Sequence, residues 1–148
     1  MKKLFLLSSL AISVIAFSCK KDEVAVNPDK IYQVSTSLSG ANELPMVTTS
    51  ATGTTTGTYN QTTKMLMVST TLNGITPTAG HIHTQTVPTT ATKSGGVTFP
   101  FTSLTSPVSF MTTLTTAQET DLLNGIMYVN FHTPANPGGE IRGNLMLK

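Results

Sequence analysis

From Ile31 onward, apolar residues recur at every second position, in short runs separated by glycine, proline and asparagine. This period is typical of a β-strand, whose successive side chains point to opposite faces of a sheet, and not of an α-helix with its period of 3.6. Turn-forming residues interrupt the runs at intervals of roughly 8–12 residues. The pattern predicts an all-β domain over residues 31–148, an antiparallel sandwich or barrel with Greek-key connections. Of the two we expect the Greek-key β-sandwich, of the immunoglobulin-like or superoxide-dismutase-like kind.

The runs that fit strands number seven or eight. Two of them, separated by the turn at residues 60–63, are expected to form a hairpin in which Gly53 and Gly57 admit a close neighbour. Pro100 places its own strand at an edge or a bulge, because proline cannot donate to a ladder. The expected strands are Ile31–Leu38, Ala51–Tyr59, Met65–Leu72, Gly80–Gln85, Val97–Phe101, Val108–Phe110, Ile126–Thr133 and Glu140–Leu147.

One short helix interrupts the strands. Thr115 or Thr116 is a suitable N-cap, and Gln118 or Glu119 three residues later completes a capping box. Leu122 and Leu123 are expected to supply its buried face. Gly125 ends the helix.

The last two strands are expected to pair as an antiparallel hairpin. Met127, Val129 and Phe131 share one face, which is predicted to look into the core together with Ile141, Gly143, Leu145 and Leu147. A simple hairpin then places His132 opposite Glu140 and Asn130 opposite Arg142. These four residues lie on the opposite, polar face of the hairpin, and any functional site in the hairpin must lie there.

The N-terminus has the pattern of an export signal. Lys2 and Lys3 precede an apolar run from Leu4 to Phe17, which is too short for a membrane span of roughly 20 residues. We expect residues 1–18 to be a signal peptide and residues 19–30 to be a lipidated cysteine with a flexible tether. The A-F-S-C segment ending at Cys19 resembles the cleavage site of bacterial lipoproteins, of the Bacteroidetes type. The resemblance implies an exported protein that is anchored by lipid to the outer membrane.

The four residues after Cys19 leave two interpretations open. Lys20 to Glu23 resemble the charged signal that sends such lipoproteins to the cell surface, and they also fit an ordinary solvated tether.

The net charge of the exported part argues against binding of nucleic acid. Without Lys2 and Lys3 the nine basic residues fall to seven, which matches the seven acidic ones. A neutral domain without a basic stripe is not expected to bind nucleic acid.

The chain contains three histidines, and their spacing suggests a metal site. His81 and His83 are two residues apart in a strand, so both imidazoles point to one face at roughly 6–7 Å, which one ion can bridge. His132 is the expected third ligand for copper or zinc, with Glu140 as a fourth ligand or as a hydrogen-bond partner of a ligand. The alternative is structural, with the histidines bonded to neighbouring hydroxyls and carbonyls.

Other reactive groups form no recognisable constellation. No serine lies in a G-X-S-X-G turn, and the single cysteine is assigned to lipid, so no enzymatic activity is expected. Glu43 and Arg142 are predicted to form a structural pair that joins the loop after the first strand to the last hairpin.

Several segments together resemble the CHRD domain, a module first described in chordin. They are L-S-G-A-N-E-L-P from Leu38, A-T-G-T from Ala51, A-G-H-I-H from Ala79, L-T-T-A-Q from Leu114 and Y-V-N-F-H-T-P-A-N-P-G-G-E-I-R-G from Tyr128. The resemblance runs from about Tyr32 to the end and implies an all-β extracellular domain without a known reaction. Met46 and the segment from Thr84 to Ser94 depart from the family pattern.

The order of the motifs is also faintly similar to copper/zinc superoxide dismutase. Three histidines are too few for the larger ligand set of that enzyme, so superoxide dismutation is not expected. Two readings of function follow. The first is a non-catalytic, lipid-anchored module that binds an unknown extracellular protein or glycan. The second is a copper- or zinc-binding domain that uses the three histidines.

Overall fold

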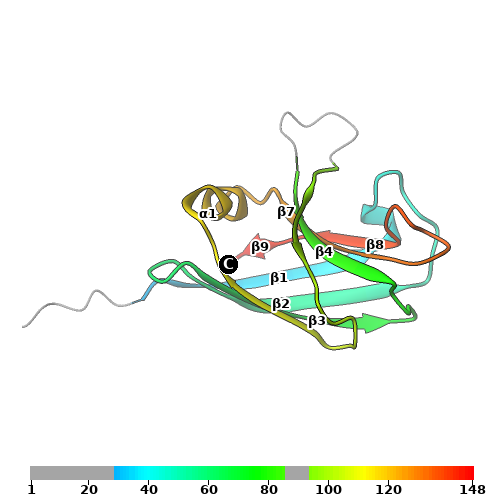
Figure 1. The fold of residues 1–148 in the computed structure, drawn as a ribbon, viewed down its shortest axis with the longest axis horizontal. Coiled ribbons are helices and arrows are strands. Elements are labelled where there is room, and N and C mark those ends of the chain that lie inside the picture. The colour runs from blue at the N-terminus through cyan, green and yellow to red at the C-terminus, as the bar shows by residue number, and fades with distance from the viewer. Residues whose placement is uncertain (1–28, 86–93) are drawn as a thin grey trace, which may run out of the picture.

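The computed structural model describes residues 29–85 and 94–148, which form one folded domain (Figure 1). The predicted signal peptide, the lipidated Cys19 and nearly all of the tether lie outside the described residues. Most of the loop predicted at residues 87–96 does so too. In the part that is described, no helix has the length and apolar character needed to cross a membrane.

Nine strands, one α-helix and one short 3₁₀ helix make up the described part of the chain. The helices are α1 (Thr116–Leu123) and η1 (Gly40–Asn42). The strands are β1 (Ile31–Ser39), β2 (Thr52–Asn60), β3 (Met65–Asn73), β4 (Ala79–Thr84), β5 (Val97–Pro100), β6 (Val108–Thr113), β7 (Met127–His132), β8 (Ile141–Asn144) and β9 (Met146–Leu147).

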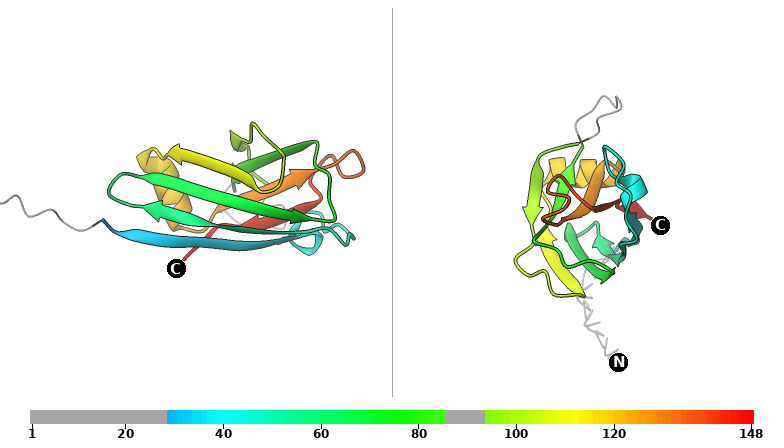
Figure 2. Two further views of the ribbon diagram at one scale, coloured as in Figure 1. Left: turned by 90° about the horizontal axis from the view of Figure 1, so that it is seen from below. Right: turned by 90° about the vertical axis from the view of Figure 1, so that its right-hand side faces the viewer.

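The strands form a single antiparallel sheet in the order β5-β4-β7-β8-β1-β2-β3-β6, with β9 also paired to β1. The sheet curls strongly, so that its two halves face each other as the two layers of the domain (Figure 2). Phe110 of β6 lies 5.4 Å from Phe99 of β5 and 5.6 Å from Phe101 between ring centres, which brings the two ends of the sheet together. The predicted all-β antiparallel fold with one short helix is confirmed.

The inner faces of the two layers form the hydrophobic core. Ile82, Phe131 and Ile141 are completely buried there, as are Met127 and Val129. The inward faces predicted for the last two strands are therefore confirmed. The predicted hairpin is also found, since β2 and β3 pair along their full length from Thr52↔Asn73 to Asn60↔Met65. A Cβ atom at Gly57 would lie 1.9 Å from the carbonyl oxygen of Met67, which explains the glycine.

The capping chemistry predicted for α1 is present. The Thr115 hydroxyl accepts a hydrogen bond from the Gln118 amide, and the Gln118 side chain accepts one from the Thr115 amide. The expected burial of both leucines is wrong, because Leu122 is 1% exposed and Leu123 is 44% exposed. Consecutive residues on an α-helix point about 100° apart, so only one of the two faces the sheet.

Much of the outer face of β4, β7 and β8 is also buried, although its side chains are polar, and His81, His132 and Asn144 on it are partly buried. Tyr128, Asn130 and Arg142 are 2–3% exposed, and His83 is 7% exposed. The segment after β1 folds against this face, where the Asn42 side-chain amide donates to the Arg142 carbonyl oxygen at 3.0 Å. A polar face without solvent is where interactions between charges, hydrogen-bonding groups and metal ions are strongest.

Replacing Tyr59 by phenylalanine should lower stability more at neutral pH than in acid. The Tyr59 hydroxyl donates to Glu119 Oε1 at 2.7 Å, and Lys64 Nζ lies 3.1 Å from Glu119 Oε2. These hydrogen bonds, that of Tyr59 first, lower the pKa of Glu119 below its ordinary value of 4.5. Their stabilisation is present above that value and disappears as the pH falls through the folded-state pKa.

Urea denaturation of wild type and Tyr59→Phe at about pH 7 and about pH 3 measures this effect. The difference between the two proteins should shrink in acid. Tyr32→Phe is the matched control, because the Tyr32 hydroxyl donates to Gln61, whose amide does not titrate. An equal loss for Tyr59→Phe at both pH values would contradict the assignment.

Candidate metal centre

Three histidines converge on the outer face of β4 and β7. His81 and His83 lie on β4, and His132 is the last residue of β7. The antiparallel register pairs Ala79 with His132 and His81 with Asn130, so the third histidine lies diagonally across from the first. One ligand atom from each of the three rings lies within 4.8 Å of the others. The convergence expected from the H-X-H motif and the distant His132 is therefore found.

Backbone carbonyls select the protonation of two of these rings. His83 Nδ1 lies 2.9 Å from the Gly95 carbonyl oxygen, and His132 Nδ1 lies 3.0 Å from that of Pro137. A carbonyl oxygen only accepts, so each Nδ1 must carry the proton, and Nε2 of the neutral ring is left with a lone pair. This is the arrangement that metal-binding histidines commonly show, with the second nitrogen bonded to a backbone carbonyl.

His83 Nε2 is the least satisfied atom of the cluster. It is buried and makes no hydrogen bond of normal geometry to the described residues, although the Asn130 side chain is close enough to raise the pKa of His83. A buried acceptor without a partner costs about 1–3 kcal/mol, so it needs a specific explanation. His81 Nδ1 is directed instead at His132 Nε2, at 3.1 Å.

Burial favours the neutral form of His81 and His83. It lowers the pKa of His81, and the neighbouring His132 and His83 lower it further. Burial also lowers the pKa of His83, although the hydrogen bond with Gly95 opposes that change. Neutral imidazole is the form that binds a metal, so the environment favours a ligand over a cation.

Tyr128 connects the histidines to the single buried arginine of the described residues. Its ring stacks on His83 with centres 4.9 Å apart and planes 6° from parallel, and Arg142 Cζ lies 3.4 Å from the centre of the Tyr128 ring. The two partners come from β4 and β8, which flank β7. The Tyr128 hydroxyl accepts a hydrogen bond from the Gly95 amide at 3.2 Å, which fixes the ring against the same residue that holds His83.

Glu140 is not among the groups that converge. Its carboxylate accepts hydrogen bonds from Thr49 at 2.7 Å and from Thr133, and these bonds lower its pKa, that of Thr133 first. The expected hairpin register is found in four pairs, including Asn130↔Arg142. The paired residues end at Phe131↔Ile141, however, and the Glu140 amide donates to the Phe131 carbonyl at 2.7 Å. Glu140 therefore anchors the loop after β7.

Glu43 and Arg142 lie in the same buried region, as a structural pair requires. They are 4% and 2% exposed. Burial raises the pKa of Glu43, and the positive charge of Arg142, followed by hydrogen bonds that include one from Asn130, opposes that rise. The two charges attract each other where solvent screens them little.

Asn130 is the functional candidate that sequence reasoning missed. Its Oδ1 lies 3.1 Å from His132 Nε2, and it faces His81 across the β4–β7 ladder. The signal for it was present in the N-F-H segment, because residues two apart on a strand share a face. That spacing also fits an ordinary polar position, so it was not decisive.

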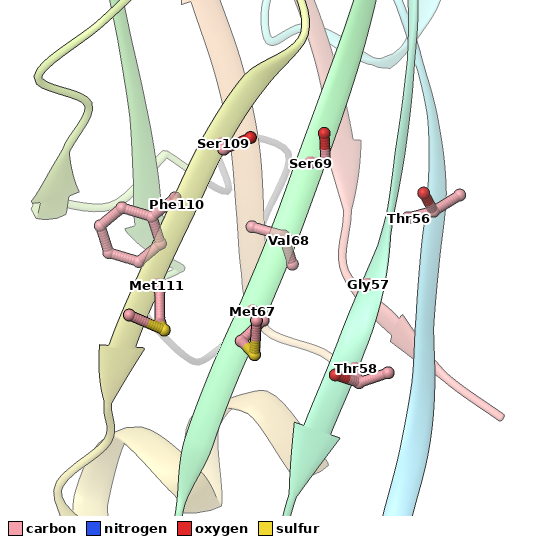
Figure 3. Close-up of a pocket in the computed structure, with 9 residues that line it drawn as sticks. All are labelled: Thr56, Gly57, Thr58, Met67, Val68, Ser69, Ser109, Phe110 and Met111. Atoms are coloured by element: carbon pink, nitrogen blue, oxygen red, sulfur yellow. The ribbon is translucent and has the colours of Figure 1, made fainter.

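A groove lies away from the histidines, on the outer face of β2, β3 and β6 (Figure 3). Its volume is about 490 Å³, and Met67 and Met111 at its rim are 46% and 62% exposed. It is lined by Thr56, Gly57, Thr58, Met67, Val68, Ser69, Ser109, Phe110 and Met111, none of which titrates or binds divalent metals strongly. The groove offers a contact surface, while the reactive groups are at the histidines.

Fold and site together define a β-sandwich module with a buried polar face and a histidine cluster at its edge. The family model for the CHRD domain matches residues 34–145, so the chain belongs to the CHRD domain family. Membership identifies the domain as a module with a binding or structural role. Neither the curated proteins nor the solved structures gave a match.

Proposed function

We propose that this domain is an exported, lipid-anchored module of the cell envelope that binds one copper or zinc ion through His81, His83 and His132. The observation that carries the proposal is the buried lone pair of His83 Nε2, which makes no hydrogen bond of normal geometry to the described residues and lies within 4.8 Å of ligand atoms of the other two histidines. An ion is the simplest group that satisfies it.

The spacing supports the same ion. Ligands at Zn–N distances near 2.1 Å in a tetrahedron lie about 3.4 Å apart, so only small movements bring the three rings onto one centre. Imidazole nitrogen is a preferred ligand of both zinc and copper. No nucleophile or acid–base constellation was recognised in the sequence, so the proposed role is to hold the ion and not to catalyse a reaction.

Metal analysis of the purified protein tests the proposal. The chain is expressed without a polyhistidine tag, purified without chelator and dialysed against zinc or copper(II). We expect one ion per chain in wild type and none in the triple variant His81→Ala, His83→Ala, His132→Ala. Gln85→Ala is a control, because this buried residue near the end of β4 hydrogen-bonds Asn144. Wild type without stoichiometric metal would refute the site.

The proposed anchor has its own experiment. Replacing Cys19 by serine should move the protein from the membrane fraction to the soluble fraction of cells, because no cysteine remains for lipid attachment. Metal content of the released protein should equal that of wild type, since the tether is not part of the site. A Cys19→Ser protein that stays in the membrane fraction would contradict lipid attachment at this residue.

A second candidate is binding of an extracellular protein or glycan. The observation that favours it is the apolar groove on β2, β3 and β6, where exposed Met67 and Met111 are cross-strand neighbours. Flexible methionine side chains adapt to different partners. The groove and the histidines are formed by different strands, so the two functions do not exclude each other.

A further inference from the structure

The Asn130 side chain lies between a carboxylate and the histidine cluster. Its Oδ1 is 3.1 Å from His132 Nε2, and its amide nitrogen is close enough to Glu43 to oppose the rise in the pKa of that carboxyl. An ionised carboxylate only accepts, so the amide NH₂ must face Glu43 and the amide oxygen must face the histidines. The orientation of Asn130 is therefore set by its neighbours.

Glycine at position 139 makes room for this arrangement. A Cβ atom there would lie 2.4 Å from Glu43 Oε1 and 2.9 Å from Asn130 Nδ2. The backbone of the P-G-G-E turn therefore packs directly against the carboxylate and the amide. Glu43 and Asn130 are 4% and 3% exposed, so bulk water has little access to the contact between them.

When the His132 ring is neutral, its contact with Asn130 joins two acceptors. His132 Nδ1 carries its proton towards the Pro137 carbonyl oxygen, so Nε2 of the neutral ring presents a lone pair to Asn130 Oδ1. Two lone pairs at 3.1 Å repel each other unless a positive charge lies between them or near both. The N–H at His81 Nδ1 can donate a hydrogen bond to only one of these two acceptors. A metal ion coordinated by both His132 Nε2 and Asn130 Oδ1 removes the repulsion.

We propose that Asn130 Oδ1 is the fourth ligand of the ion held by His81, His83 and His132, and that Glu43 is a positioning residue that turns this oxygen towards it. The inference rests on the proposed metal site. It gives that site a three-nitrogen, one-oxygen ligand set in which all four atoms are neutral. Four ligands are the number that a closed zinc site has.

Cobalt(II), a spectroscopic substitute for zinc, tests the ligand in the full-length protein. Asn130→Leu should change the visible spectrum of the cobalt form and weaken zinc binding at least about tenfold, the lower end of the range for groups around a metal. Asn144→Leu is the matched control, because Asn144 lies on the same face but bonds Gln85 and Gly125. It should keep both the spectrum and the affinity of wild type.

The role of Glu43 is tested by Glu43→Leu and Glu43→Gln. Leucine removes the acceptor for the Asn130 amide, and should change the cobalt spectrum towards that of Asn130→Leu. Glutamine keeps an oxygen acceptor, and should restore the wild-type spectrum. If glutamine and leucine give the same spectrum, Glu43 does not position the ligand.

A measurement without substitution covers the case in which Asn130→Leu fails to fold. In isotope-labelled wild type, zinc should shift the side-chain carbonyl resonance of Asn130 far more than that of Asn144. Zinc bound with an unchanged Asn130 resonance, or an Asn130→Leu protein with wild-type affinity and spectrum, would overturn the fourth ligand while leaving the three-histidine site intact. Wild type that binds no metal would instead refute the proposed function itself.

Discussion

Zinc or copper(II) at about one hundred times its dissociation constant is expected to raise the free energy of unfolding of the domain by about 2.7 kcal/mol. The three histidines are separated by up to 51 residues along the chain, so only the folded state brings their nitrogens together. A ligand that binds the folded state alone stabilises it by mass action. For a domain of this size the midpoint of thermal unfolding should rise by roughly 10 °C.

Thermal unfolding followed by circular dichroism, with and without metal, measures this shift, and an excess of chelator should reverse it. The triple variant His81→Ala, His83→Ala, His132→Ala should show no shift at the same metal concentration. Thr84→Ala, on the same strand as His81, should keep it, because the Thr84 hydroxyl bonds Thr98 and not the histidines. A triple variant that is stabilised as much as wild type would place the ion elsewhere.

The sequence predicted those parts of the fold that depend on neighbouring residues. The alternation in Met127, Val129 and Phe131 placed them in the core, where all three are completely buried. The capping box of Thr115 and Gln118 fixed the start of the helix because its chemistry involves only four consecutive residues. Pro100 predicted that its strand lies at an edge of the sheet or at a bulge, and β5, which ends at Pro100, is at one end of the sheet.

Features that depend on distant pairing were not predictable. Nothing local shows that β4 is inserted between β5 and β7, or that the outer face of β7 is covered, because these result from packing of the whole chain. The alternation of apolar and polar residues correctly separated the core face of these strands from the polar face. It did not show that Asn130 and Arg142 on the polar face are only 3% and 2% exposed.

The same difference between local pattern and distant pairing explains which candidate ligands were predicted correctly. His81 and His83 were placed on one face by strand geometry, and His132 joined them through the β4–β7 register. Glu140 was expected near His132 by extending the hairpin one pair further. The loop after β7 instead directs its carboxylate to Thr49, a residue 91 positions away in the sequence. Asn130, and not Glu140, is the residue whose side-chain oxygen lies next to His132.

Removing one member of the buried Glu43 and Arg142 pair should have a large effect on stability. Arg142→Met is expected to lower the free energy of unfolding of the metal-free protein by about 3–5 kcal/mol, the effect of removing one partner from a buried charge pair. Glu43 is 4% exposed, and without Arg142 it loses the positive charge that opposes the rise in its pKa. The Tyr128 ring loses its stacked guanidinium in the same variant.

Urea denaturation in the presence of chelator separates these contributions. Arg142→Lys keeps the charge but not the planar group that stacks on Tyr128, so its loss should lie between those of wild type and Arg142→Met. In the double variant Glu43→Gln, Arg142→Met no unpaired charge remains, and most of the lost stability should return because a buried pair contributes little net free energy once both charges are removed. If Arg142→Met costs less than about 1 kcal/mol, or if the double variant is less stable than the single one, the two residues are not coupled, and the loop after β1 is held to β8 by its hydrogen bonds alone.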